Sequence, residues 1–312
     1  MGKNDLTKAY VAAVFFSFLV GFSFLWIKLC IPYADSLHIL AHRFNFALLT
    51  LILVIVFKIA KVDIKGKPKK NLMITAGCYV GFMFFQVIGM YFATSIEGAI
   101  IFAAIPVMVQ IIAAVFLGEK TTWRHNVFVA VSACALIIMV ILGSSDISVD
   151  PFGTVMLFLS SICMALSNVF MRYVRNQYKP IEISTAIIVM GTVVFNLMFI
   201  IKGMFAGNEI GYFEPYKNIE FIIGMVYLGS GCILVSAQIM AYMQSKLQAA
   251  KASIFSNVST AITIVAGALI LGEPLREYHI ICTAFIIAGV VGLNFFGNKG
   301  GKKNEVSVSD GK

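Results

Sequence analysis

The sequence predicts an all-α integral membrane protein with ten transmembrane helices in two inverted five-helix repeats. The chain has 312 residues, of which 60% are hydrophobic and 12% are charged. That is about half the charged fraction of a typical soluble domain, so a soluble protein is excluded. The apolar runs are long enough to cross a bilayer, and the end of the first half of the chain resembles the end of the second.

The predicted helices are apolar runs that lie between breaks containing charged residues, glycine or proline. Each can cross about 30 Å of hydrocarbon as an α-helix, which satisfies its own backbone hydrogen bonds. The first run is too long for the apolar part of a signal peptide and is interpreted as the first helix. The predicted spans are 9–31, 36–57, 71–93, 98–117, 125–143, 152–171, 181–201, 219–242, 248–271 and 278–297.

Lysine and arginine collect in alternate connections, which predicts orientation. The richest connection is 58–70, and more basic residues lie near the N-terminus, in 172–179 and in the tail 298–312. Because cytoplasmic loops are enriched in Lys and Arg, both termini are expected in the cytoplasm. We expect a multi-pass protein of the cell membrane, in a bacterial inner membrane. The net charge of +9 is therefore assigned to topology and lipid contact, and no nucleic-acid partner is expected.

An internal repeat suggests how the spans are organised. Leu117-Gly118-Glu119 recurs as Leu271-Gly272-Glu273 after matched apolar runs. Because five spans are an odd number, the second copy starts on the opposite side of the membrane from the first. Inverted repeats are typical of transporters that open a central site alternately to each side. The predicted divisions are a first repeat at 8–143, a second at 150–297 and a cytoplasmic polar tail at 298–312.

These residues carry a family resemblance. The paired endings, together with Pro106 and the small residues 249–253, resemble the EamA repeat of the drug/metabolite transporter superfamily over roughly 8–297. The resemblance implies a central cavity lined by helices one, three, four, six, eight and nine, and says nothing about the substrate. Thr260 stands where the second repeat often has proline, so helix nine is expected to be less kinked than helix four.

The predicted function is secondary transport of a small polar metabolite by alternating access. Amino acids or related compounds are the leading substrate class, and export is one of the directions left open. Two alternatives within the superfamily are a flippase for a lipid-linked carrier and a multidrug or cation exporter. The sequence contains no phosphate loop, nucleophile elbow, HExxH or CxxC motif, so no enzymatic activity, cofactor or metal is expected. No obligate protein partner is predicted, and a homodimer is left open.

Polar residues at membrane depth are candidates for the substrate site, because a charge there costs about 3 kcal/mol. Arg43 can hold a carboxylate or phosphate through two donors, or alternatively snorkel or brace a neighbouring helix. His42 is a candidate beside it, with a structural role as the alternative. The remaining candidates either line a wet cavity, bond between helices or, for the tryptophan, anchor at the interface: Trp26, Tyr79, Gln86, Gln110, Asn168, Gln238, Tyr242 and Asn257.

A second set is assigned to gates or helix ends. Pro106 is expected to kink the fourth helix. Glu119 and Glu273 are expected to cap the helix that follows each, where a carboxylate meets unpaired N–H groups. Glu97 and Lys251 occupy matched repeat positions with opposite charge. They either bias the two gates differently or are solvated loop charges.

Overall fold

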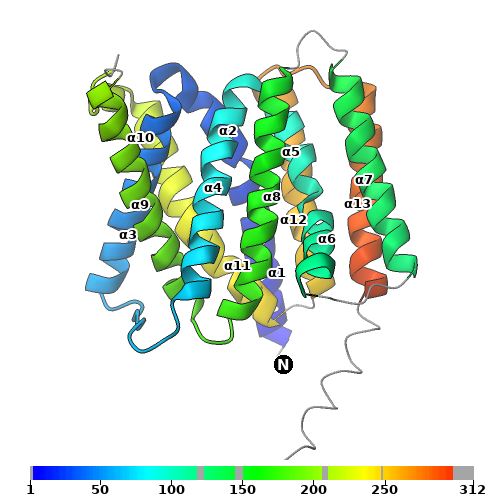
Figure 1. Cartoon of the computed structure of the whole chain (residues 1–312), viewed down its shortest axis with the longest axis horizontal. Helices are drawn as coiled ribbons and strands as arrows, with labels where there is room; N and C mark the ends of the chain where they lie inside the picture. Colours follow the sequence, from blue (N-terminus) through cyan, green and yellow to red (C-terminus); the bar gives the residue numbers. More distant parts are fainter. Residues whose placement is uncertain (1–2, 118–122, 145–149, 206–209, 247–248, 298–312) are drawn as a thin grey trace, which may run out of the picture.

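The computed structural model describes residues 3–117, 123–144, 150–205, 210–246 and 249–297, and all regular elements in these ranges are helices that form one bundle (Figure 1). The positions of Glu119 and of the tail 298–312 lie outside the described residues, as does the side chain of Lys251.

The helices of the first half follow the predicted spans closely. The α3 helix begins after Asp35, whose carboxylate accepts a hydrogen bond from the His38 N–H at 2.9 Å and so caps the first turn. The elements are α1 (Lys3–Gly21), α2 (Ser23–Cys30), η1 (Ile31–Tyr33), α3 (Ser36–Val56), α4 (Lys70–Phe92), α5 (Ser95–Ala103), α6 (Ile105–Leu117) and α7 (Trp123–Ser144).

The second half contains similarly long helices and one π-helical segment, η3. The elements are α8 (Pro151–Val174), α9 (Pro180–Phe205), η2 (Glu214–Lys217), α10 (Ile219–Val226), η3 (Tyr227–Val235), α11 (Ser236–Lys246), α12 (Ala249–Ile270) and α13 (Glu277–Gly297).

Three predicted spans are interrupted. The first is split at Phe22 between α1 and α2, and the fourth at Ala104 between α5 and α6. Pro106 lies just after the second break, where its missing N–H weakens the helix. The eighth span changes from α-helix to π-helix at Tyr227, which widens the turn. As expected, α12 passes Thr260 without a break.

The apolar character of the described helices agrees with a multi-pass membrane protein. Seven helical segments are long and apolar enough to cross a bilayer, and two shorter apolar segments, Asn257–Ile270 and Glu277–Gly292, are also present. Ten spans and their inverted arrangement therefore stay predictions.

Small residues allow the helices to approach closely. Gly191 on α9 faces Phe44 on α3, and a Cβ there would lie 2.2 Å from the ring. Gly289 on α13 faces Ser132 on α7 in the same way, at 1.9 Å from the hydroxyl oxygen. Figure 1 shows α7 and α13 side by side at one edge of the bundle. Small residues at such contacts are typical of helix packing in membranes.

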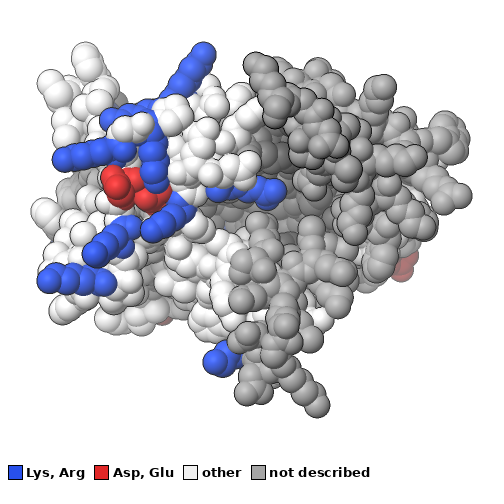
Figure 2. Space-filling model, turned by 90° about the horizontal axis from the view of Figure 1, so that it is seen from below, with Lys and Arg blue, Asp and Glu red and all other residues white. Residues whose placement is uncertain are grey.

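The two ends of the bundle differ in charge. We call the end that carries loop 57–69, the start of α1 and the end of α13 the lower face, and the end that carries loops 31–35 and 271–276 the upper face (Figure 1). Figure 2 shows Lys and Arg gathered on the lower face. The loop 57–69 is attached there by an ion pair of 2.7 Å between Lys67 and Glu182 at the start of α9.

Candidate functional site

Arg43 is a buried cation beside the π-helical segment. Its side chain is on α3 and the residue is 2% exposed. The Nε donates to the Leu228 carbonyl at 3.3 Å, and Nη1 has no hydrogen-bond partner among the described residues. Gly229 allows this approach, because a Cβ there would lie 2.2 Å from the Arg43 carbonyl oxygen. The guanidinium is thus held at one nitrogen and retains an unused donor.

The ionisable groups near Arg43 do not neutralise it. Within the described part of the chain they are the side chains of Cys232, Tyr79 and Cys30, none of which is a carboxylate. Burying an unpaired charge costs several kcal/mol, so a buried arginine without an ionised partner is a candidate for binding a group of opposite charge. An anionic group of a bound molecule fits this requirement, because guanidinium binds carboxylate or phosphate through two parallel hydrogen bonds.

Gln86, another candidate residue, is on the same helix as Tyr79. Gln86 lies seven residues after Tyr79 on α4, so the two occupy the same helix face. The Gln86 side chain is buried and its Oε1 has no partner among the described residues. Tyr79 thus lies within electrostatic range of Arg43, and Gln86 is two turns farther along α4.

His42 points elsewhere, although it is adjacent to Arg43. One ring nitrogen lies 2.8 Å from the Tyr212 carbonyl oxygen and the other 2.7 Å from the Tyr216 hydroxyl. Asn45 and Asn196 join the same cluster, and the Tyr212 hydroxyl donates to the Asn196 amide oxygen at 2.6 Å. The cluster fastens segment 210–217 over the upper ends of α3 and α9.

Trp26 lies where the first span meets the eighth. Its ring centroid is 5.7 Å from that of Tyr227, and Gly224 leaves room for it. The Tyr227 hydroxyl donates to the Leu19 carbonyl at 2.8 Å, one turn from the break at Phe22. These contacts hold the interrupted part of the first span against the π-helical segment.

The remaining polar candidates are distributed over several helices. The Gln238 amide donates to the Ser184 hydroxyl at 3.1 Å, which links α11 to α9. Asn257 on α12 is buried and its Nδ2 has no partner among the described residues. Two others, Gln110 and Asn168, are partly buried, and Tyr242 is exposed.

Glu273 caps a helix, but a different one from the helix predicted. The carboxylate accepts from the Ser95 N–H at 2.8 Å, the Ser95 hydroxyl at 2.7 Å and the Ile96 N–H at 3.1 Å. It therefore caps α5 and not the following helix α13. The positive φ of 66° at Gly272 turns the chain back toward α5, which explains the difference.

Glu97 is buried at the start of α5 and is not the solvated loop charge that was one of the two expectations for it. It is 3% exposed and forms a capping box with Thr94 at the start of α5. Lys28 on α2 lies within electrostatic range of both Glu97 and Glu273. The upper ends of α2, α5 and α12 thus share a cluster of three charges.

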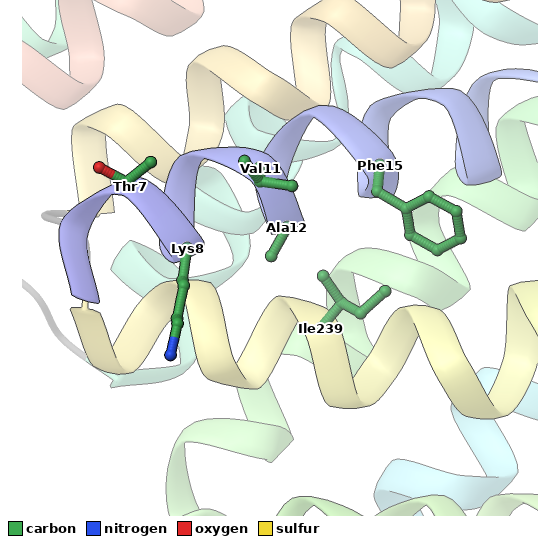
Figure 3. Close-up of a pocket in the computed structure, with 6 residues that line it drawn as sticks. All are labelled: Thr7, Lys8, Val11, Ala12, Phe15 and Ile239. Atoms are coloured by element: carbon green, nitrogen blue, oxygen red, sulfur yellow. The ribbon is translucent and has the colours of Figure 1, made fainter. Parts of the chain in front are cut away.

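A groove lies on the side of the bundle between α1 and α11. Figure 3 shows that Val11, Ala12 and Phe15 of α1 and Ile239 of α11 line it, with Lys8 at one end. Its volume is about 610 Å³. The lining is mainly apolar, so the groove differs from a polar cavity that would receive a lipid head group.

Sequence reasoning missed several of these residues. Asn45 was detectable as an amide at membrane depth, like Asn196. Tyr212, Tyr216 and Ser95 carry no such signal, because loop and helix-start residues are polar in most proteins and their partners are far away in the sequence.

Comparisons with known proteins give a consistent result. A model of the EamA-like transporter family matches residues 7–141 and 151–295. The uncharacterized transporter YcxC of Bacillus subtilis is 34% identical over 94% of this chain and 95% of its own length. An uncharacterized transporter of Archaeoglobus fulgidus is 22% identical over 86% of this chain and 92% of its own.

A solved crystal structure is similar in fold. It aligns with a TM-score of 0.59 over 88% of this chain and 95% of its own, at 14% identity. At this identity the likeness concerns the fold alone.

Proposed function

Because the chain belongs to the EamA-like transporter family of the drug/metabolite transporter superfamily, we propose that it is a secondary transporter that moves a small polar metabolite by alternating access. The observation that carries the proposal is Arg43, a buried cation that, within the described part of the chain, has an unused donor and no carboxylate among its ionisable neighbours. Amino acids and related carboxylate-bearing compounds are the proposed substrates.

The proposed architecture has two inverted repeats of five spans, 8–143 and 150–297. In this scheme the first span, α1 and α2, corresponds to α8, and α3 corresponds to α9. The α4 helix corresponds to the span from α10 to α11. The fourth span, α5 and α6, corresponds to α12, and α7 corresponds to α13. The packing supports the correspondence. The α4 helix packs on α8 as α11 packs on α1, and α3 packs on η3 as α9 packs on α4.

The interrupted helices support a binding region near the middle of the bundle. In transporters, interruptions of spanning helices often adjoin the substrate site. Here the π-helical segment adjoins Arg43. The segment also contacts the first span near the break at Phe22, because the Tyr227 hydroxyl and the Cys232 thiol both donate to the Leu19 carbonyl. We propose that Arg43 anchors a carboxylate and that Tyr79, Gln86 and Trp26 contribute contacts to the rest of the molecule.

The proposed location is the cell membrane of a bacterium, with the lower face and both termini in the cytoplasm. Its support is the charge of the lower face, since cytoplasmic loops retain Lys and Arg. The basic residues of loop 57–69 and the adjacent start of α4 are Lys58, Lys61, Lys65, Lys67, Lys69 and Lys70.

The test is transport by purified protein in liposomes without ATP. Vesicles are loaded with one compound of a panel of amino acids, amines, nucleosides and sugars, and uptake of the same labelled compound is followed. We expect exchange of at least one carboxylate-bearing compound. If none of the panel is exchanged and none raises the melting temperature of the protein, metabolite transport is the wrong proposal.

The alternative, translocation of a lipid-linked carrier, is an outcome of the same experiment. Lipid translocation is supported if a lipid with a fluorescent head group moves to the opposite leaflet in vesicles that contain the protein and not in vesicles without it. The groove in Figure 3 does not itself offer a site for a head group, because its lining is mainly apolar and a head group needs polar partners.

A further inference from the structure

Glu273 joins the two halves of the chain at the upper face. Three donors, the N–H and hydroxyl of Ser95 and the N–H of Ile96, point at its carboxylate from the first turn of α5. These residues are 178 and 177 positions away in sequence. Gly267 makes the approach possible, since a Cβ there would lie 2.5 Å from the Ser95 hydroxyl oxygen and 2.8 Å from the Glu273 carboxylate.

The contact between the fourth span and α12 is concentrated in the upper half. Among the described residues, α12 packs along α5, whereas α6, the lower half of the same span, packs on α8 and α7 and has sparse or no contact with α12. The change of direction occurs at Ala104, just before Pro106. Among the described residues, the fourth span and α12 are thus joined mainly at the upper end of the bundle.

The first span contacts both of these helices, since α2 packs on α5 and on α12. Lys28 lies near the upper end of α2 and within electrostatic range of Glu273 and Glu97. Glu97 is committed to the capping box with Thr94, so Glu273 is the carboxylate whose removal leaves the first two N–H groups of α5 without a partner.

We propose that Glu273 and the first turn of α5 form a latch that closes the upper end of the transport path and must open in every transport cycle. The inference rests on the proposed transport function. The latch consists of hydrogen bonds to a partly exposed carboxylate, so water can replace them when α5 and α12 separate. A contact of this kind suits a reversible closure better than an apolar seam.

A disulfide across the latch tests whether it must open. In Ser95→Cys/Gly267→Cys the two new side chains face each other, because a Cβ at 267 would lie 2.5 Å from the position of the Ser95 hydroxyl oxygen. The shift that an S–S bond needs also displaces the Glu273 carboxylate, so the reduced form of the same variant is the reference for the oxidised form. We expect oxidation to reduce exchange in liposomes at least tenfold and a reductant to restore it. Wild-type protein treated with the same oxidant controls for the six free cysteines. Equal exchange by the oxidised and reduced variant would overturn the latch.

A second measurement needs no substrate and separates failure of the latch from failure of the transport proposal. Hydrogen exchange is compared for wild type, Glu273→Ala and Glu277→Ala, an exposed carboxylate at the start of α13. Glu273→Ala is expected to speed exchange severalfold in α2 as well as α5, while Glu277→Ala leaves both unchanged. If the increase is confined to Ser95 and Ile96, Glu273 is only a static cap and the inference is wrong, whether or not any compound is transported.

Discussion

The Thr263 hydroxyl donates to the Gly21 carbonyl at 2.6 Å, which fastens α12 to the last residue of α1 just before the break at Phe22. Thr263 is 3% exposed, so water does not compete for this carbonyl. The break in the first span is therefore stabilised by a residue of the other half of the chain.

Thr263→Val should lower the free energy of unfolding by about 1 to 3 kcal/mol. Valine has nearly the shape of threonine, but leaves the buried Gly21 carbonyl without its side-chain partner. Thr263→Ser keeps the hydroxyl and is the control, with a smaller loss. Thermal unfolding in detergent measures both. Equal melting temperatures for the Val and Ser variants would show that the hydrogen bond contributes nothing.

Gly191→Ala should destabilise the α3 and α9 pair by about 1 to 3 kcal/mol, because the added methyl group overlaps the Phe44 ring. Gly77→Ala on α4 is the matched control. The nearest atom to its Cβ is the Met190 sulfur at 3.9 Å, so alanine fits there and should stabilise by up to about 1 kcal/mol. Thermal unfolding in one detergent compares the pair. Similar effects at both positions would contradict the packing argument.

Asp35, at the upper face, should make the free energy of unfolding depend on pH. Burial alone would raise the pKa of its carboxyl, but hydrogen bonds from His38 and Lys202 lower that pKa below its ordinary value. A depressed pKa contributes stability that is present above the unfolded value, about 3.9, and is lost as pH falls through the folded value.

The Asp35 variants separate charge from capping. Asp35→Asn keeps an N-cap acceptor and should differ from wild type at pH 7 by at most about 1 kcal/mol, with the difference shrinking below about pH 4. Asp35→Ala also loses the cap, at a further cost of about 1 kcal/mol. Melting temperatures at pH 7 and pH 3 test both, and a wild-type advantage that grows on acidification would have the wrong sign.

Orientation can be tested with single cysteines on the two faces. In intact cells an impermeant maleimide should label Lys217→Cys, whose side chain is 75% exposed near the upper face, and should not label Lys65→Cys in loop 57–69. Lys65 is preferable to Lys67, which holds Glu182. Permeabilised cells provide the positive control. The reverse pattern would place the lower face outside the cell.

The helix positions were accessible from the sequence because apolar runs and their polar ends directly reflect the bilayer. The span predicted at 36–57 is α3 at Ser36–Val56, and that predicted at 248–271 is α12 at Ala249–Ile270. The break near Pro106 was predictable from the missing N–H. The break at Phe22 was not, because it depends on contacts from Thr263 and Tyr227 that only the fold brings there.

The sequence identified residues of the candidate site, but it did not predict which groups they contact. Arg43 was singled out as a buried charge, but its neighbour His42 turns to Tyr216, because consecutive helical residues point about 100° apart. The Glu273 cap was expected on the next helix in sequence. Its real partner, α5, is reached because α12 ends in a glycine turn beside it.

Arg43 is expected to bind its anionic partner through the geometry of the guanidinium and not through charge alone. If Arg43 binds the carboxylate of a substrate, Arg43→Lys should impair transport as well, because a single ammonium does not reproduce the two-donor fork. The lost charge-assisted contact corresponds to about 1.5 to 3 kcal/mol, or roughly one to two decades in affinity. The loss should fall on carboxylate-bearing compounds and spare their decarboxylated analogues.

The alternative is that Arg43 only braces η3 through the Leu228 carbonyl. In that case Arg43→Lys and Arg43→Gln should lower the melting temperature and reduce transport of both analogues alike. The measurement is transport per folded molecule for each variant with each analogue. A carboxylate-selective loss assigns the substrate contact to the guanidinium of Arg43, and an equal loss leaves Arg43 as a structural residue.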